Sequence, residues 1–204
     1  MKFETPKIFI SSALLLFGVN VVSAVSVLTT LTSNLPEFTQ DDYMLGGGYL
    51  IQPFTTGDAA SLSELQISSN SGWNVADTPT VSLLDSGRNI VADFVYQSSA
   101  YELVNYSVSS NGGSSYALEA AKTYFIQING GSGYLNVTTS PSQTGLPNWT
   151  IGDGFFTGFD STASAQSSQI LKFSLSGQVP EPATGSLLVV GFGFFALARR
   201  FKRS

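Results

Sequence analysis

Carboxylates are the main side chains in this sequence that could do chemistry. The 204 residues include 14 Asp and Glu but neither His nor Cys. Without imidazole or thiol groups, Ser-His-Asp and Cys-His catalysis, His- or thiolate-bound zinc and disulfides are excluded. Glycoside hydrolysis would need only two carboxylates at a set separation. Because the spacing selects no pair, we interpret the acids as solvated turn residues and predict no enzyme. The acids considered are Asp41, Asp42, Asp85, Asp93, Glu102 and Glu119.

Metal binding offers one weaker alternative. Asp153 and Asp160 flank a loop that contains two glycines, and Asp41 and Asp42 supply a second pair. Calcium takes six to eight oxygen ligands, some of them backbone carbonyls, but the loop lacks the closely alternating acids of an EF-hand. We therefore expect no cofactor, with Ca²⁺ as the alternative at Asp153 and Asp160.

Aromatic side chains could form a stacking platform for sugars. Several lie in stretches rich in glycine and typical of loops. A β-protein with few other large residues also needs aromatic rings in its core, so core packing is the favoured interpretation and glycan binding the alternative. The candidate glycan-binding residues are Trp73, Trp149, Phe155 and Phe156, with Phe159 beside them.

The C-terminal segment has three parts in a fixed order. Val179 is followed by Pro180, Glu181 and Pro182, and the two prolines favour an extended, stiff backbone. Residues 183–198 carry no charge, and as a helix they would span roughly 24 Å of the membrane. A basic cluster follows and should stay cytoplasmic. Its members are Arg199, Arg200, Lys202 and Arg203.

This order of motif, apolar helix and basic cluster resembles the PEP-CTERM sorting domain of exported bacterial proteins. The resemblance covers about an eighth of the chain, residues 178–204, with the motif at 179–182. It implies that an exosortase, a multi-span membrane protein, recognises the motif and processes the chain. It also implies an exopolysaccharide setting. An ordinary single-span anchor with a Pro-rich linker is the alternative.

The N-terminal segment fits a secretory signal peptide over residues 1–24. Lys2 and Lys7 form a basic start, and a mostly apolar stretch over residues 8–22 follows. Small residues precede the expected cleavage between Ala24 and Val25. An uncleaved N-terminal anchor is the alternative. We expect export, inner-membrane anchoring before processing, and a final location at the cell surface or outside the cell.

The body between the two signals is acidic. It holds 12 acids and three bases, Arg88, Lys122 and Lys172, for a net charge of −9, against −5 for the whole chain. Such a body excludes a basic nucleic-acid face and should be repelled by anionic lipid.

Short β-prone runs alternate with Gly, Asn and Ser turns along the body. We expect an all-β fold over residues 25–177, an antiparallel β-sandwich of jelly-roll type, flanked by the signal helix and the transmembrane helix. Residues 80–84 and 90–96 should form a hairpin, residues 134–138 should pair back onto 124–128, and 170–175 should lie at a sheet edge. Pro53 predicts an edge or a bulge. Residues 117–121 are the one candidate helical turn. The expected strands are 49–56, 62–67, 80–84, 90–96, 103–108, 124–128, 134–138 and 170–175.

The body also resembles the exported bacterial choice-of-anchor domains of the R type. The matching features are residues 52–57, 62–67, 81–85 and 118–128, with Trp149 beyond them. These are core-strand patterns, so the resemblance implies a fold and no activity. The leading hypothesis is thus a structural or adhesive protein of an exopolysaccharide matrix. A carbohydrate-binding module is the alternative, and a carboxylate-based glycan-active enzyme is a third hypothesis.

Overall fold

The described part of the chain is made of β-strands. In this computed structural model the described residues are 24–31, 42–44, 48–69, 78–100, 103–131, 134–139, 142–158 and 165–179. Every regular element in these ranges is a strand, and the strands pair antiparallel, so the predicted all-β antiparallel class is confirmed. The two expected flanking helices, over residues 1–24 and 183–198, lie outside the described residues.

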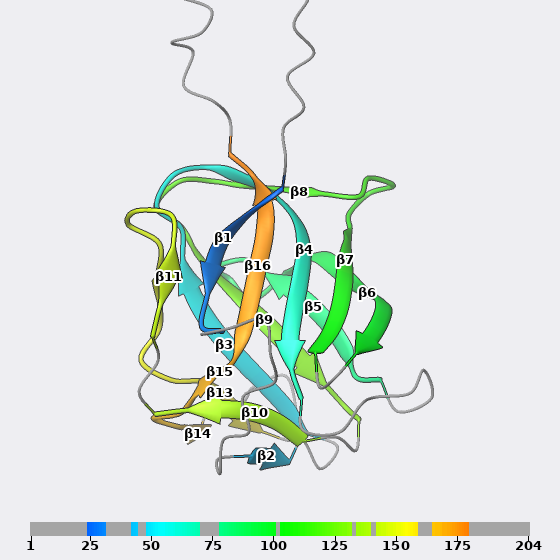
Figure 1. Cartoon of the computed structure of the whole chain (residues 1–204), viewed down its shortest axis with the longest axis vertical. Coiled ribbons are helices and arrows are strands. Elements are labelled where there is room, and N and C mark those ends of the chain that lie inside the picture. Colours follow the sequence, from blue (N-terminus) through cyan, green and yellow to red (C-terminus); the bar gives the residue numbers. More distant parts are fainter. Residues whose placement is uncertain are drawn as a thin grey trace, which may run out of the picture.

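The strands form one large sheet and one small sheet (Figure 1). The large sheet has 13 strands and curls into a half-barrel, and a three-stranded sheet of β15, β10 and β2 lies at one end. The strands are β1 (Val25–Thr29), β2 (Asp42–Met44), β3 (Tyr49–Thr55), β4 (Ala60–Ser68), β5 (Thr80–Leu84), β6 (Ile90–Ala100), β7 (Leu103–Ser109), β8 (Tyr116–Leu118), β9 (Thr123–Asn129), β10 (Tyr134–Thr138), β11 (Thr144–Gly145), β12 (Thr150–Ile151), β13 (Phe156–Gly158), β14 (Ala165–Gln166), β15 (Ile170–Leu171) and β16 (Phe173–Gln178).

Alternating side chains give the curled sheet its buried inner face. In β9, Tyr124, Ile126 and Ile128 are buried and the residues between them are half-buried, as expected for a strand with one face on the core. The large sheet runs in the order β11-β1-β16-β4-β7-β6-β5-β9-β3-β13-β14. Because this order brings distant segments together, the core is built from non-local contacts.

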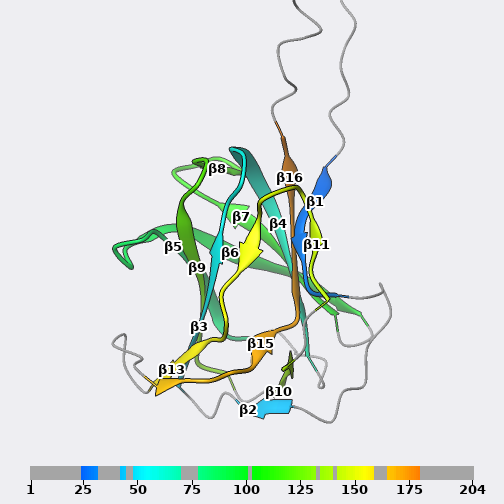
Figure 2. The same ribbon diagram turned by 90° about the vertical axis from the view of Figure 1, so that its left-hand side faces the viewer.

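A short segment connects two strands, β1 and β3, that lie near opposite ends of this path. β11 pairs with β1, and β12 pairs with β3, yet only four residues separate β11 from β12 (Figure 2). We call residues 144–151 the closing segment. Gly145 has a φ of 148° and leaves no room for a Cβ against the backbone of Val27. Gly57 meets the closing segment in the same way, because a Cβ there would overlap the backbone of Pro147.

The chain bends at Lys172 to pass from the small sheet into the large one. Buried side chains satisfy the backbone on both sides of this bend: Gln52 Oε1 accepts a hydrogen bond from the Leu171 N–H at 2.9 Å, and Thr30 Oγ1 accepts one from the Phe173 N–H at 2.7 Å. The N–H of Lys172 donates to the Asn136 carbonyl oxygen at 3.0 Å. The side chain of Lys172 is itself buried. Of the three basic residues in the body, Arg88 and Lys122 are therefore the two that are exposed.

Several strand predictions are confirmed. The hairpin of β5 and β6 forms as expected. Pro53 lies opposite Phe125 of β9, while on its other side β3 pairs with β13 over residues 49–51 and with β12 over residues 54–55. The partner strand is interrupted beside Pro53, which agrees with a position where regular pairing breaks.

Three other predictions are wrong. Strand β10 does not pair back onto β9 but joins β15 and β2, because it crosses to the small sheet. The candidate helical turn at residues 117–121 is instead the end of β8 and a turn, since β8 pairs with β4. The strand expected at a sheet edge over residues 170–175 does not form as one strand: β15 lies at the edge of the small sheet, but β16 lies between β1 and β4 in the large sheet. The jelly-roll subtype stays a prediction.

Candidate functional site

The two ends of the described chain meet at one end of the half-barrel. Val25, at the start of β1, pairs with Gly177 near the end of β16. Gln178 pairs in turn with Ser61 of β4. Both termini of the described chain therefore leave the barrel side by side (Figure 1).

Val179 follows β16 directly and stays in contact with the barrel. Its side chain is half-buried and packs against the hydrophobic core. The first residue of the predicted sorting motif is thus held on the folded body, with no linker between strand and motif. The other motif residues, Pro180, Glu181 and Pro182, lie outside the described residues, as do Arg199, Arg200, Lys202 and Arg203.

A polar hollow of about 200 Å³ lies at this same end of the barrel. The register places the β3–β4, β5–β6 and β8–β9 turns together here, since Thr55 pairs with Thr123 and Leu84 with Phe125. The hollow is lined by Asp85, Ser86, Val91, Tyr116, Glu119, Lys122, Thr123 and Tyr124.

The acids of this hollow have structural partners. Asp85 Oδ1 accepts a hydrogen bond from the Asn89 N–H at 2.9 Å and closes the β5–β6 turn. This bond and those from the Asn89 side chain hold the pKa of Asp85 below its ordinary value of 3.8. Glu119 lies 3.9 Å from Lys122 Nζ in an exposed i,i+3 ion pair. Such exposed pairs contribute little, so these acids serve the turns.

An aromatic row connects the hollow with the core. Trp149 stacks on Phe54 with ring centroids 6.3 Å apart, and Phe54 stacks on Tyr124 at 6.0 Å. Tyr124 meets Tyr116 edge to face at 6.4 Å. Burial, followed by the nearby Tyr124, raises the pKa of Tyr116 above its usual 10. The row anchors the closing segment, which carries Trp149.

Among the described residues, Trp149 and Phe155 do not offer exposed rings for sugar binding. Trp149 is 2% exposed and Phe155 is fully buried, so core packing accounts for both rings and neither offers a face to a sugar. Phe156 is half-buried, and the guanidinium of Arg88 lies 5.2 Å from its ring centroid. Trp73 and Phe159 lie outside the described residues. The glycan-binding assignment of Trp149 and Phe155 is therefore withdrawn.

The calcium candidates are not assembled in the described residues. Asp153 is exposed between β12 and β13, and its proposed partner Asp160 lies outside the described ranges. Within those ranges, no three acidic side chains lie close enough together to hold a metal ion.

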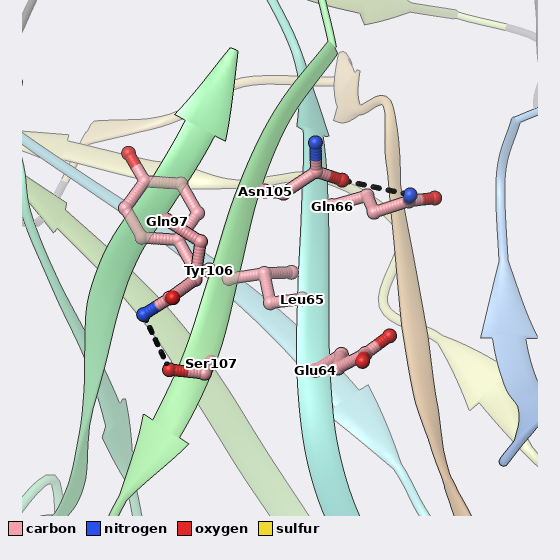
Figure 3. A pocket seen from close by; sticks show the side chains of 7 residues that line it. All are labelled: Glu64, Leu65, Gln66, Gln97, Asn105, Tyr106 and Ser107. Atoms are coloured by element: carbon pink, nitrogen blue, oxygen red, sulfur yellow. Dashed lines mark hydrogen bonds between the residues drawn. The ribbon is translucent and has the colours of Figure 1, made fainter.

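A second hollow, of about 190 Å³, lies on the outer face of β4, β7 and β6 (Figure 3). The sequence does not predict this hollow, because its polar residues occupy ordinary outward-facing strand positions and come together only through the register of three strands. The alternation of polar and apolar residues in 64–67 and 104–108 is the only sequence signal. The hollow is lined by Glu64, Leu65, Gln66, Gln97, Asn105, Tyr106 and Ser107.

Comparison with known families identifies the C-terminal segment. Residues 178–203 match the family model of the PEP-CTERM protein-sorting motif. The chain carries a PEP-CTERM sorting signal. This motif marks exosortase-sorted exported proteins and implies exosortase recognition and membrane anchoring at the C-terminus. No curated protein sequence matches the chain.

The PEP-CTERM signal begins where the last strand ends. Its first matched residue, Gln178, is also the last residue of β16, and its second, Val179, packs against the core, so the signal starts within the folded body. The described ranges contain no helix of sufficient length and apolar character to cross a membrane. The predicted transmembrane segment, residues 183–198, lies outside those ranges.

Proposed function

We propose that this chain is a non-enzymatic, exported surface or matrix protein that an exosortase processes at its C-terminal signal. The match of residues 178–203 to the PEP-CTERM sorting motif carries this proposal. A structural or adhesive role in an exopolysaccharide matrix follows as the finer part, and the absence of His and Cys from the sequence supports a body without Ser-His-Asp or Cys-His catalysis.

The position of β1 supports export by a cleaved signal peptide. The expected cleavage lies between Ala24 and Val25, and Val25 is the first residue of β1. Cleavage there removes the apolar segment and leaves the strand that pairs with β16 complete. The signal peptide and the sorting signal would then act at the same end of the barrel.

The short junction fixes how the body would stand before processing. Four peptide steps separate Val179 from Ala183, the first residue of the predicted transmembrane helix, and they reach at most about 14 Å. The end of the barrel with Val25 and Gly177 would therefore face the membrane. The acidic body and the basic cluster after residue 198 then lie on opposite sides, in agreement with the positive-inside rule.

The experiment that tests this proposal compares cells with and without the exosortase. The proposal expects cells without the enzyme to hold the full-length chain in the inner membrane, and normal cells to hold a shorter chain at the surface or in the medium. The same fractionation profile in both cell types would overturn it. A variant with Pro180 and Pro182 both changed to Ala should behave in normal cells as the wild type does without the enzyme.

A further inference from the structure

The hollow on the outer face of β4, β7 and β6 presents a row of polar side chains, of which one, Glu64, is an acid. We define the amide groove by its outward-facing residues Glu64, Gln66, Gln97, Asn105 and Ser107 (Figure 3). Leu65 and Tyr106 alternate with them along the strands and have buried side chains. The groove thus has a rigid floor, because the residues beneath it belong to the core.

Cross-strand hydrogen bonds hold the amides of the groove in place. Gln66 Nε2 donates to Asn105 Oδ1 at 2.8 Å, which joins β4 to β7. Gln97 Nε2 donates to Ser107 Oγ at 2.8 Å, which joins β6 to β7. A primary amide has two N–H donors and a carbonyl acceptor. Gln97 Nε2 also donates to the Val95 carbonyl oxygen at 3.2 Å, so Gln97 offers a ligand its carbonyl oxygen, whereas Gln66 offers an N–H as well as its carbonyl oxygen. Side chains fixed in advance lose less entropy when they bind.

A β-bulge turns two consecutive residues of β6 toward the groove. Tyr96 pairs with Tyr106 and Ser98 with Asn105, so Gln97 is the extra residue in the ladder. Gln97 reaches Ser107, while Ser98 Oγ accepts a hydrogen bond from Asn105 Nδ2 at 3.3 Å. A regular strand would send adjacent side chains to opposite faces, and bulges that re-aim a side chain are common beside functional sites.

We propose that the amide groove binds a neutral, hydroxyl-rich glycan chain, one sugar residue at a time. Amide, hydroxyl and carboxylate groups match the donors and acceptors of sugar hydroxyls. The lining residues include one acid, Glu64, and no Lys or Arg. The groove therefore repels anionic polymers such as polyuronates. The net negative charge of the body repels them as well.

The size and place of the groove fit binding to a long polymer. Its volume is below the roughly 300–1,000 Å³ of pockets for drug-sized ligands, so we expect a single groove to bind with low affinity. A polymer that contacts many anchored copies of the chain at once binds with higher overall affinity. The groove lies on the side of the barrel, whereas the sorting signal leaves from one end. The inference rests on the adhesive part of the proposed function and on no step of exosortase processing.

Affinity electrophoresis of the full-length chain in detergent micelles tests the proposal. The gels contain dextran, hydroxyethyl cellulose or soluble starch as neutral polymers, and alginate as the anionic polymer. We expect at least one neutral polymer to slow the chain and alginate to have no effect. The double variant Gln97→Ala/Asn105→Ala should bind that polymer about tenfold more weakly, since it loses two polar groups. Where the double variant fails to fold, Gln97→Ala alone serves, because its side chain is exposed.

Thr55→Ala is the matched control. It removes a comparable cross-strand hydrogen bond, between Thr55 Oγ1 and Thr123 Oγ1 at 3.1 Å, which joins β3 to β9 away from the groove. It should bind as the wild type does. Retardation by none of the neutral polymers, equal retardation by alginate, or equal weakening by the control would each overturn the proposal. The groove variants should still be processed in cells, so a failure of glycan binding is separable from a failure of sorting.

Discussion

Val25 and Gly177 lie opposite each other in the ladder of β1 and β16. The first residue expected in the mature chain is thereby paired with the residue that precedes the matched sorting signal, which begins at Gln178. Strand β16 is also paired with β4 on its other side, up to Gln178. The motif therefore begins on a strand that is held from both sides, and an exosortase must reach it beside a folded domain.

Access to Val179 should limit processing. Inserting Gly-Ser-Gly-Ser between Gln178 and Val179 moves the motif off the core against which Val179 packs. We expect faster conversion of the full-length chain to the shorter form in a pulse–chase experiment. The same insertion between Asn111 and Gly112, in the exposed β7–β8 turn, is the control and should keep the wild-type rate. A slower rate for the first insertion would argue that the enzyme reads the barrel together with the motif.

Trp149 should be a principal anchor of the closing segment. Trp149→Ala leaves a cavity beside Phe54 and should lower the free energy of unfolding by about 3–5 kcal/mol. Trp149→Phe keeps a ring that can stack and should cost less. Denaturant unfolding followed by circular dichroism measures both. A loss below about 1 kcal/mol for the alanine variant would mean that the segment is not held by this ring.

Tyr106 should be more stable as phenylalanine. Its side chain is 2% exposed, and within the described residues its hydroxyl is buried without a hydrogen-bond partner. Since an unsatisfied buried hydroxyl carries a desolvation penalty, Tyr106→Phe should raise the free energy of unfolding by about 1 kcal/mol. In the wild type, the Glu119 N–H donates to the Tyr124 hydroxyl at 3.1 Å. The matched variant Tyr124→Phe removes this acceptor, so the free energy of unfolding should fall by about 1 kcal/mol. Equal changes of the same sign would contradict this account.

Acid should weaken the β5–β6 turn through Asp85. The pKa of this carboxyl is lower in the folded chain than its ordinary value of 3.8, because Asn89 donates hydrogen bonds to it. Its contribution is complete above pH 3.8 and is lost as the pH falls through the lower folded pKa. Asp85→Asn should therefore flatten the dependence of stability on pH below 3.8. A variant that is as acid-sensitive as the wild type in thermal melts at pH 2–4 would contradict the assignment.

The sequence predicted strands well and their partners poorly. Residues such as Tyr124, Ile126 and Ile128 alternate clearly, so β9 could be located from local pattern alone. The partners of β10 could not, because Asn136 and Leu135 suit either a hairpin with β9 or the small sheet. The bend at Lys172, between β15 and β16, decides the matter because it places β15 beside β10. The side chains that hold this bend belong to Gln52 and Thr30, which are more than 100 residues away in sequence.

The candidate sites show the same division. The sorting signal is contiguous, so its motif, apolar run and basic cluster could be identified in order. The amide groove is assembled from three strands and a bulge at Gln97, which only the register reveals. The aromatic candidates failed for a related reason: a ring in a Gly-rich stretch can point inward, as Trp149 and Phe155 do.

The position of the C-terminus of the chain in normal cells, determined by mass spectrometry, tests the central claim most directly. Intact-mass and peptide analysis of the chain recovered from the surface and the medium would locate its last residue. The account predicts an end at or near Val179–Pro182, with the apolar run and Arg199–Arg203 removed, and the complete chain in cells without the exosortase. A chain that still ends at Ser204 in normal cells would contradict it.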